Sequence, residues 1–196
     1  MWCRGAESIA HHRAQERGSP ETDTQPSAPK HIEDALLTIN EMPSGWSSAP
    51  AEKGSDAGLC GAKASNTTDP IDQAKAMFVG NPTISVPQVQ HVIARFEPGE
   101  AEVRFDEFLK LANDCQSFVQ DGQKVVASDL SFAKVGDDSI ALRYVVENEA
   151  GLSAIADFVL WRRGDVAMFL SYASLGPDPV AVKQLVNKAD AKLQKL

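Results

Sequence analysis

The sequence lacks the patterns that point to a reaction. It has no G-x-S-x-G pattern, no glycine-rich phosphate loop and no histidine placed to activate a serine. The acid pair Glu100 and Glu102 stands at an expected helix start, and the pair Asp137 and Asp138 stands in a turn. Acids are common at both places without a catalytic task. We therefore expect no catalytic residue and no enzyme.

Metal-ligand spacing is absent too. The three cysteines form no C-x-x-C pair, and the four histidines are scattered without zinc spacing, so we expect no metal and no cofactor. No run of eighteen apolar residues predicts a membrane span. Residues 1–18 are charged and lack the apolar stretch of a secretory signal. Either the protein is cytosolic, or the given start omits a targeting segment.

Basic residues are fewer than acidic residues. The 19 Lys and Arg residues are outnumbered by 27 Asp and Glu residues, and the formal net charge is −8. Nucleic-acid binding needs a concentrated basic face, and the sequence contains no Lys/Arg cluster of that kind. We therefore expect no nucleic-acid partner.

The chain divides into a tail and a domain. Residues 1–30 are polar, and residues 19–29 are rich in Pro, Ser and Thr, which predicts a disordered tail or tether. Residues 31–196 have room for one domain with a full core. Within it, residues 31–46 predict a short amphipathic helix and a turn that ends at Trp46. Residues 47–70 have loop composition, and residues 71–78 are expected to form a short helix.

One long amphipathic helix is expected at the centre of the domain. Apolar residues recur at alternating spacings of four and three and predict one buried stripe: Ala101, Phe105, Phe108, Ala112, Cys115 and Val119. Pro98-Gly99 predicts its start and Asp121-Gly122 its end. We expect this helix, over 100–120, to cross a sheet.

Strand-like alternation surrounds that helix. Period-two patterns predict five strands near 86–96, 125–132, 139–147, 152–162 and 166–172, and short turns join the last three as antiparallel neighbours. Asp178 and Pro179 predict the start of a final helix over 179–196. The expected fold class is α/β (α+β), with a mainly antiparallel sheet of about five strands and helices packed on it.

A polar pair is predicted on two of these strands. If the hairpin 139–162 closes with Asn148 opposite Leu152, Arg143 lies directly across from Asp157 on a mostly apolar face. The pair is either a structural cross-strand ion pair, which we favour, or a charged contact in a cleft. We name four candidate ligand-binding residues: Trp46, Arg143, Asp157 and Trp161.

The cysteines allow a disulfide. Cys60 lies in the long loop and Cys115 on the buried side of the central helix, so a bridge would tie that loop to the core. In the chain-entropy model, closing a loop of this length stabilises a protein by roughly 4 kcal/mol. Disulfides persist in oxidising compartments. The alternative is two unrelated free thiols, and Cys3 in the tail has no assigned partner.

The order of elements resembles a known family. The segment LLTINEMPSGW (36–46) is similar to the opening of actinobacterial envelope lipoproteins and sensor-like domains. It is followed by a cysteine loop, a helix with Asp114-Cys115, the segment VGDDSIALR (135–143), a hairpin with WRRGDVAMF (161–169) and a final helix. Over about residues 32–196 this order resembles the PknH-like extracellular sensor domain and, more loosely, the Mog1/PsbP-like lipoproteins.

The resemblance implies an antiparallel sheet with packed helices, held by a disulfide, outside the cytoplasmic membrane. It implies binding or sensing rather than catalysis, with an unknown small ligand or envelope component as partner. We expect an extracytoplasmic, non-catalytic ligand- or partner-binding domain, secreted or tethered to the cell envelope through a missing N-terminal segment. A carrier of lipid or small apolar molecules, a small enzyme and a structural envelope component remain open.

Overall fold

The fold is built around one antiparallel sheet. A computed structural model describes residues 31–51, 69–80, 87–120, 122–147 and 153–196. Eight strands form the sheet in the order β1-β2-β3-β8-β7-β6-β5-β4, and every neighbouring pair is antiparallel. Their bounds are β1 Ser47–Ala49, β2 Asp72–Val79, β3 Gln88–Arg95, β4 Ser117–Gln120, β5 Gln123–Asp129, β6 Asp138–Glu147, β7 Ser153–Arg163 and β8 Val166–Ser174. The class is therefore α+β, as expected.

The expected number of strands was too low. The five predicted strands correspond to β3, β5, β6, β7 and β8, while β1, β2 and β4 were not predicted. The short helix expected over 71–78 was wrong, because β2 pairs with β3 along its whole length, from Asp72 opposite Arg95 to Val79 opposite Gln88. Tertiary pairing overrides the weak helical preference of the local residues.

The helix expected over 100–120 was too long. Helix α1 spans Glu100–Asp114 and begins after Gly99, whose φ of 84° is easily adopted without a Cβ. Cys115 then takes an extended conformation, with φ −101° and ψ 91°, and the chain enters β4. Val119 consequently lies on β4 with 69% of its surface exposed, and it is not part of the helical stripe.

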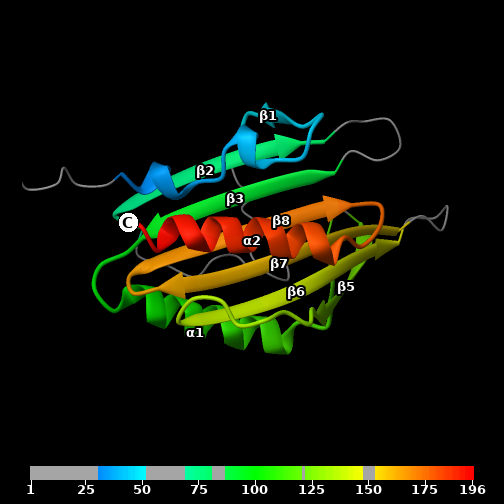
Figure 1. The fold of residues 1–196 in the computed structure, drawn as a ribbon. Coiled ribbons are helices and arrows are strands. Elements are labelled where there is room, and N and C mark those ends of the chain that lie inside the picture. Colours follow the sequence, from blue (N-terminus) through cyan, green and yellow to red (C-terminus); the bar gives the residue numbers. More distant parts are fainter. Residues whose placement is uncertain (1–30, 52–68, 81–86, 121, 148–152) are drawn as a thin grey trace, which may run out of the picture.

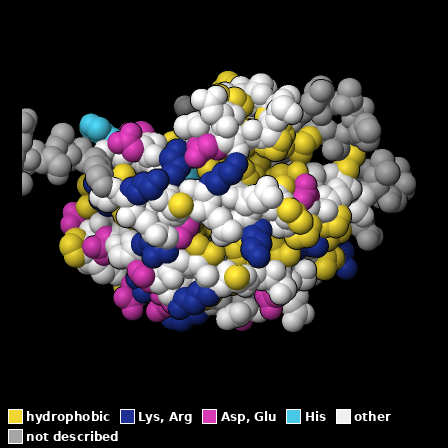
Figure 2. Space-filling view, viewed as in Figure 1, with side chains coloured by type: hydrophobic (Ala, Val, Ile, Leu, Met, Phe, Trp, Pro, Cys, Tyr) yellow, Lys and Arg dark blue, Asp and Glu magenta, His cyan; other side chains and the backbone are white. Residues whose placement is uncertain are grey.

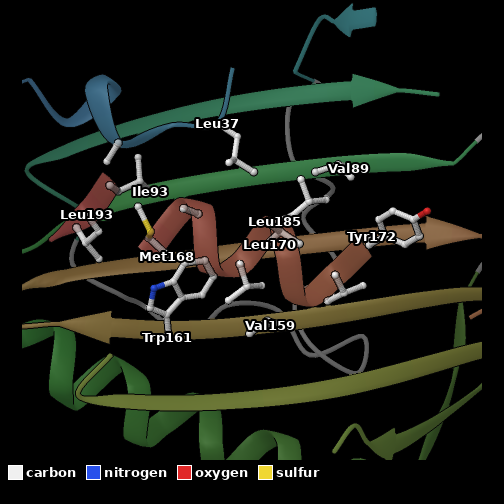
Figure 3. Packing of buried hydrophobic residues seen from close by; sticks show 14 of the residues in the cluster. Leu37, Val89, Ile93, Val159, Trp161, Met168, Leu170, Tyr172, Leu185 and Leu193 are labelled. Carbon is white, nitrogen blue, oxygen red and sulfur yellow. The ribbon is translucent and has the colours of Figure 1, made fainter. Parts of the chain in front are cut away.

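The two long helices cover opposite faces of the sheet. Helix α2 (Pro179–Leu193) lies across β8 and β7 (Figure 1). It packs on the side chains that point to one face of the strands, and Figure 3 shows them under the helix: Val89, Ile93, Val159, Trp161, Met168 and Leu170. Helix α1 packs on the opposite face, where Ala112 and Phe108 meet Leu142 and Tyr144. Both faces are thus at least partly covered.

The start of α2 follows the sequence closely. Asp178 accepts a hydrogen bond from the backbone N–H of Ala181 at 3.0 Å, and Pro179 occupies the first helical position. The N-cap and N1 assignments made from sequence are therefore confirmed. Within the described segments no helix is long and apolar enough to cross a membrane.

The segment before β1 lies beside α2. It forms two short 3-10 helices, η1 (Ile32–Ala35) and η2 (Ile39–Glu41), where a single amphipathic helix was expected. Ile32, Ala35 and Leu37 are buried in the core that α2 covers. The predicted tail, residues 1–30, lies outside the described residues.

Candidate functional site

A groove lies between α2 and the segment that leads into β1. Its volume is about 480 Å³. In the space-filling view, hydrophobic surface gathers between this segment and α2, with charged side chains near its margins (Figure 2). We call it the Trp46 groove; its lining residues are Glu41, Met42, Pro43, Trp46, Pro87, Tyr172, Asp178, Ala181, Gln184, Leu185 and Lys188.

One wall of the groove is a single stripe of α2. Ala181, Gln184, Leu185 and Lys188 recur at three- and four-residue spacing, and Asp178 extends the same stripe to the N-cap. Residues at these spacings share one side of a helix. Buried side chains on the adjoining side of α2, including Val182 and Val186, fix the helix on the sheet. The stripe that lines the groove is therefore held by the same packing that anchors the helix.

Two aromatic rings meet in the groove. Trp46 and Tyr172 have ring centroids 6.3 Å apart with a tilt of 39°. Tyr172, on β8, is only 7% exposed, whereas Trp46 is half-buried. Burial raises the pKa of Tyr172, and the negative charges of Asp178 and Asp157 raise it further. The Tyr172 hydroxyl therefore stays protonated at neutral pH.

Gly80 allows the indole to approach the backbone closely. A Cβ built at this position would lie 2.5 Å from Cγ of Pro87 and 3.1 Å from Cε2 of Trp46. The amide of Gly80 also donates a hydrogen bond to the carbonyl of Pro87 at 2.8 Å. The Trp46 ring thus rests against a surface that only glycine leaves clear.

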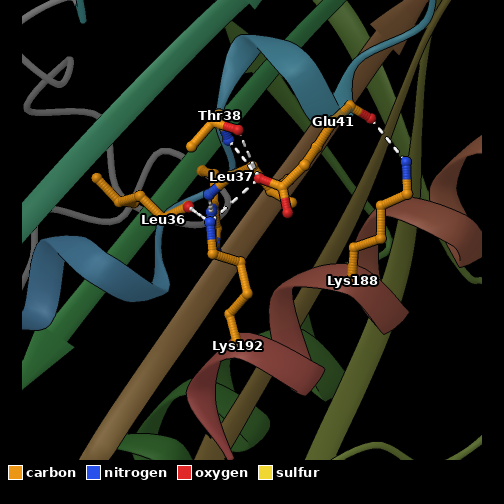
Figure 4. Close-up of polar contacts among 7 residues, drawn as sticks. Leu36, Leu37, Thr38, Glu41, Lys188 and Lys192 are labelled. Carbon is orange, nitrogen blue, oxygen red and sulfur yellow. Dashed lines mark hydrogen bonds and ion pairs between the residues drawn. The ribbon is translucent and has the colours of Figure 1, made fainter. Parts of the chain in front are cut away.

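The other wall is tied to α2 by two lysines (Figure 4). Lys188 donates to the carbonyl oxygen of Glu41 at 2.7 Å. Lys192 donates to the carbonyl oxygen of Leu36 and pairs with the Glu41 carboxylate at 3.1 Å. The same carboxylate accepts from the Thr38 amide at 2.7 Å and from its hydroxyl at 2.9 Å. Burial raises the pKa of Glu41, but these hydrogen bonds outweigh it and lower the pKa overall.

A buried histidine forms a hydrogen bond with the segment that makes up this wall. Nδ1 of His91, on β3, accepts the backbone N–H of Leu37 at 3.1 Å. The imidazole is fully buried and lies parallel to the Trp161 indole at a centroid distance of 6.3 Å. Burial lowers the pKa of His91 to about 4, and the nearby charge of Lys192 acts in the same direction. The ring is therefore neutral at pH 7, with its proton on Nε2.

The four candidate ligand residues do not converge on one site. Trp46 lies in the groove. Arg143 and Asp157 form the cross-strand ion pair that the register predicted, and Asp157 lies opposite Tyr172 in the β7–β8 pairing. Trp161 is fully buried under α2 (Figure 3). A ligand role for these residues stays a prediction.

The sequence does not reveal that Tyr172, Asp178 and Lys188 lie in one groove with Trp46. Asp178 was identified only as an N-cap, and Tyr172 only as a strand residue. The contact between Trp46 and Tyr172 joins residues far apart in the chain, and it depends on β8 lying near the middle of the sheet. No local pattern carries that information.

Two further expectations concern cysteines and metals. Cys60 lies outside the described residues, so its pairing with Cys115 stays a prediction. Over the described ranges no three His, Cys, Asp or Glu side chains come together in a group suited to a metal ion.

The chain has a structural likeness to a protein of known structure. No family model and no curated protein sequence matches this chain. Among solved structures, the chain is similar to the extracellular domain of PknH from Mycobacterium tuberculosis, with 11% sequence identity and a TM-score of 0.49. The alignment covers 62% of this chain and 64% of that chain, so the likeness spans less than two thirds of either one. At this level it concerns part of the backbone arrangement and carries no statement about function.

Proposed function

We propose that this chain is a non-catalytic ligand-binding domain that acts outside the cytoplasmic membrane and holds a small molecule in the Trp46 groove. The observation that carries the proposal is the groove itself. Its volume of about 480 Å³ falls within the range of about 300–1,000 Å³ that is usual for small-molecule sites. Most lining side chains are apolar or aromatic, and a few polar groups stand among them.

The groove fits a ligand better than the interior does. The space between the sheet and α2 is filled by large side chains, among them Trp161, Met168 and Leu170, which are fully buried. A bound molecule therefore has the groove beside α2 available, with Trp46 as its aromatic wall. This placement favours a small-molecule binder over a carrier that encloses a lipid in the sheet–helix interface.

The extracytoplasmic part of the proposal rests on the sequence. The segment 36–46 and the later order of elements resemble envelope sensor domains, and the expected disulfide between Cys60 and Cys115 suits an oxidising compartment. The polar residues 1–30 suit a tether to the envelope.

The test is a ligand screen followed by two-dimensional amide and indole NMR of the full chain. We expect saturable shifts of the Trp46 indole and of the amides near Tyr172, and their loss in Trp46→Ala. Trp46→Phe keeps an aromatic ring at the site and is expected to retain part of the binding. Saturable binding that leaves the groove signals unmoved, or turnover of the bound compound, would contradict the proposal.

Location is tested separately in the native host. A reporter that is active only after export is fused to the C-terminus of the protein as the native gene encodes it. We expect this fusion to give reporter activity. A reporter that remains inactive, together with recovery of the domain in the cytosolic fraction, would overturn the location while leaving the groove's binding untouched.

A further inference from the structure

We propose that the Trp46 groove selects ligands that carry an organic cation, an ammonium or a guanidinium group, on an apolar body, with the cation held by Trp46, Tyr172 and Asp178. This inference rests on the proposed function and names the class of ligand. It comes from the presence, in one groove, of two aromatic rings and a carboxylate that has no ion-pair partner among the described residues.

The aromatic part of the site suits a cation. The faces of Trp and Tyr rings attract ammonium and guanidinium groups that come within about 6 Å of the ring centroid. Trp46 keeps part of its surface accessible, and Tyr172 is fixed next to it by its position on β8. The close approach of the indole to Gly80 limits its movement, so Trp46 offers a preformed aromatic surface beside Tyr172.

Asp178 supplies the opposite charge. One of its carboxylate oxygens accepts the Ala181 N–H at the start of α2. Throughout the described part of the chain, no Lys, Arg or His nitrogen lies within 4 Å of this carboxylate. Asp157, the other acid that acts on Tyr172, is paired with Arg143. Asp178 is therefore the acid at this end of the groove whose charge is available to a ligand.

The opposite end of the groove has the other sign. Lys188 lies on the same stripe of α2, and at a rise of 1.5 Å per residue it is roughly 15 Å from Asp178 along the helix axis. Glu41, which also lines this end, is paired with Lys192, while Lys188 donates, as far as the described segments go, only to a carbonyl oxygen. A cation is thus favoured at Asp178 and disfavoured at Lys188, so the groove also orients its ligand.

The experiment compares four probes with the same alkyl chain: hexyltrimethylammonium, hexylammonium, hexanol and hexanoate. Binding to the full chain is measured by titration with NMR detection at moderate salt. We expect both cations to shift the signals of Trp46 and Tyr172 and to bind at least tenfold more tightly than hexanol. Hexanoate is expected to bind more weakly than either cation.

Two variants test whether the carboxylate of Asp178 is the charge that attracts the cation. Asp178→Asn removes the carboxylate but keeps an N-cap of equal quality, so the start of α2 is retained. We expect it to weaken the binding of both cations about tenfold and to leave hexanol unchanged. Asp106→Asn removes an exposed acid from α1, on the opposite face of the sheet, and is expected to change neither.

The outcomes separate the two proposals. If hexanol and hexanoate bind in the groove as tightly as the cations, or if Asp178→Asn leaves cation binding intact, the cation preference is overturned and a ligand groove remains. If no probe and no compound of the wider screen moves the Trp46 and Tyr172 signals, the groove is not a binding site and both proposals fail.

Discussion

The guanidinium of Arg143 and the carboxylate of Asp157 face each other across β6 and β7 and share two hydrogen bonds, of 2.6 and 2.8 Å. The Asp157 side chain is only 1% exposed, and the Arg143 side chain is 23% exposed. The bidentate geometry raises the pKa of Arg143. The pair thus contains a nearly buried carboxylate whose charge is balanced by Arg143.

Removal of Arg143 is expected to destabilise the fold strongly. Arg143→Ala leaves the Asp157 carboxylate buried without its cation, which costs about 3–5 kcal/mol in comparable pairs. Urea unfolding measures this loss directly. Arg163→Ala is the matched control, because Arg163 makes the same type of bidentate contact with Asp190 but is more exposed, and a smaller loss is expected.

A second variant separates charge from packing. Replacement of both partners, Arg143→Met with Asp157→Leu, removes the buried charge altogether and is expected to recover part of the loss. If Arg143→Ala unfolded at the same urea concentration as the parent protein, the pair would have no structural role, and its candidate role in ligand contact would gain weight.

This ion pair also shows what the sequence was able to predict. A turn and the strict alternation of strand residues fix the register of a hairpin, so the position of Arg143 opposite Asp157 followed from local information. The sequence did not predict that β2 is a strand. Its residues are compatible with a helix, and only pairing with β3 along its whole length makes it a strand.

The groove was predicted only in part, for a similar reason. Trp46 stood out because a lone tryptophan after a turn is conspicuous in the sequence. Its neighbours Tyr172 and Asp178 are brought to it by the strand order, in which β8 inserts between β3 and β7. Such an insertion depends on the packing of the whole sheet, and the sequence of a single strand does not reveal it.

His91 is expected to make stability depend on pH. Its pKa is about 4 in the folded protein, where burial and the charge of Lys192 lower it and the charge of Glu41 raises it, against 6.5 for the free side chain. Between these values the unfolded chain binds more protons, so stability falls as pH decreases from about 6.5 toward 4. The full difference corresponds to about 3 kcal/mol.

The measurement is urea unfolding at several pH values for the parent and for His91→Asn, whose amide oxygen is able to accept the Leu37 N–H. We expect the difference between the two proteins to shrink by about 3 kcal/mol from pH 7 to pH 4. His31→Asn changes an exposed histidine and is the control. A constant difference across this range would show that His91 titrates normally in the folded state.

Lys192 is expected to hold the segment before β1 on α2. Its ammonium donates to the carbonyl of Leu36 and to the carboxylate of Glu41. Hydrogen bonds to charged groups contribute about 2 kcal/mol each, and partial exposure of both side chains reduces this here, so we expect Lys192→Met to cost about 1–2 kcal/mol.

Hydrogen exchange gives the local test of the Lys192 contact. In Lys192→Met the amide of Leu37, which donates to His91, is expected to exchange faster, while amides in β6 and β7 keep their protection. Lys195→Met removes an exposed lysine near the same chain end and serves as the control. Equal protection of Leu37 in both variants would mean that core burial alone holds this segment.

The proposed pairing of Cys60 with Cys115 leads to a last prediction. Cys115 lies directly after α1, where the chain turns into β4, so a bridge there would fix the junction of helix and sheet. Cys60→Ser and Cys115→Ser are each expected to lower stability by roughly 4 kcal/mol. The double variant should lose no more than either single variant, because both remove the same bond. Cys3→Ser is the control and is expected to change nothing.

Mass spectrometry after alkylation decides the state of the thiols in protein from its native host. In denatured, unreduced protein, Cys3 alone should react, and Cys60 and Cys115 should react only after reduction. Since structural disulfides persist where the surroundings are oxidising, this result would also support the proposed location outside the cytoplasmic membrane. Full alkylation of all three cysteines without reduction would contradict the bridge and remove the main chemical support for that location.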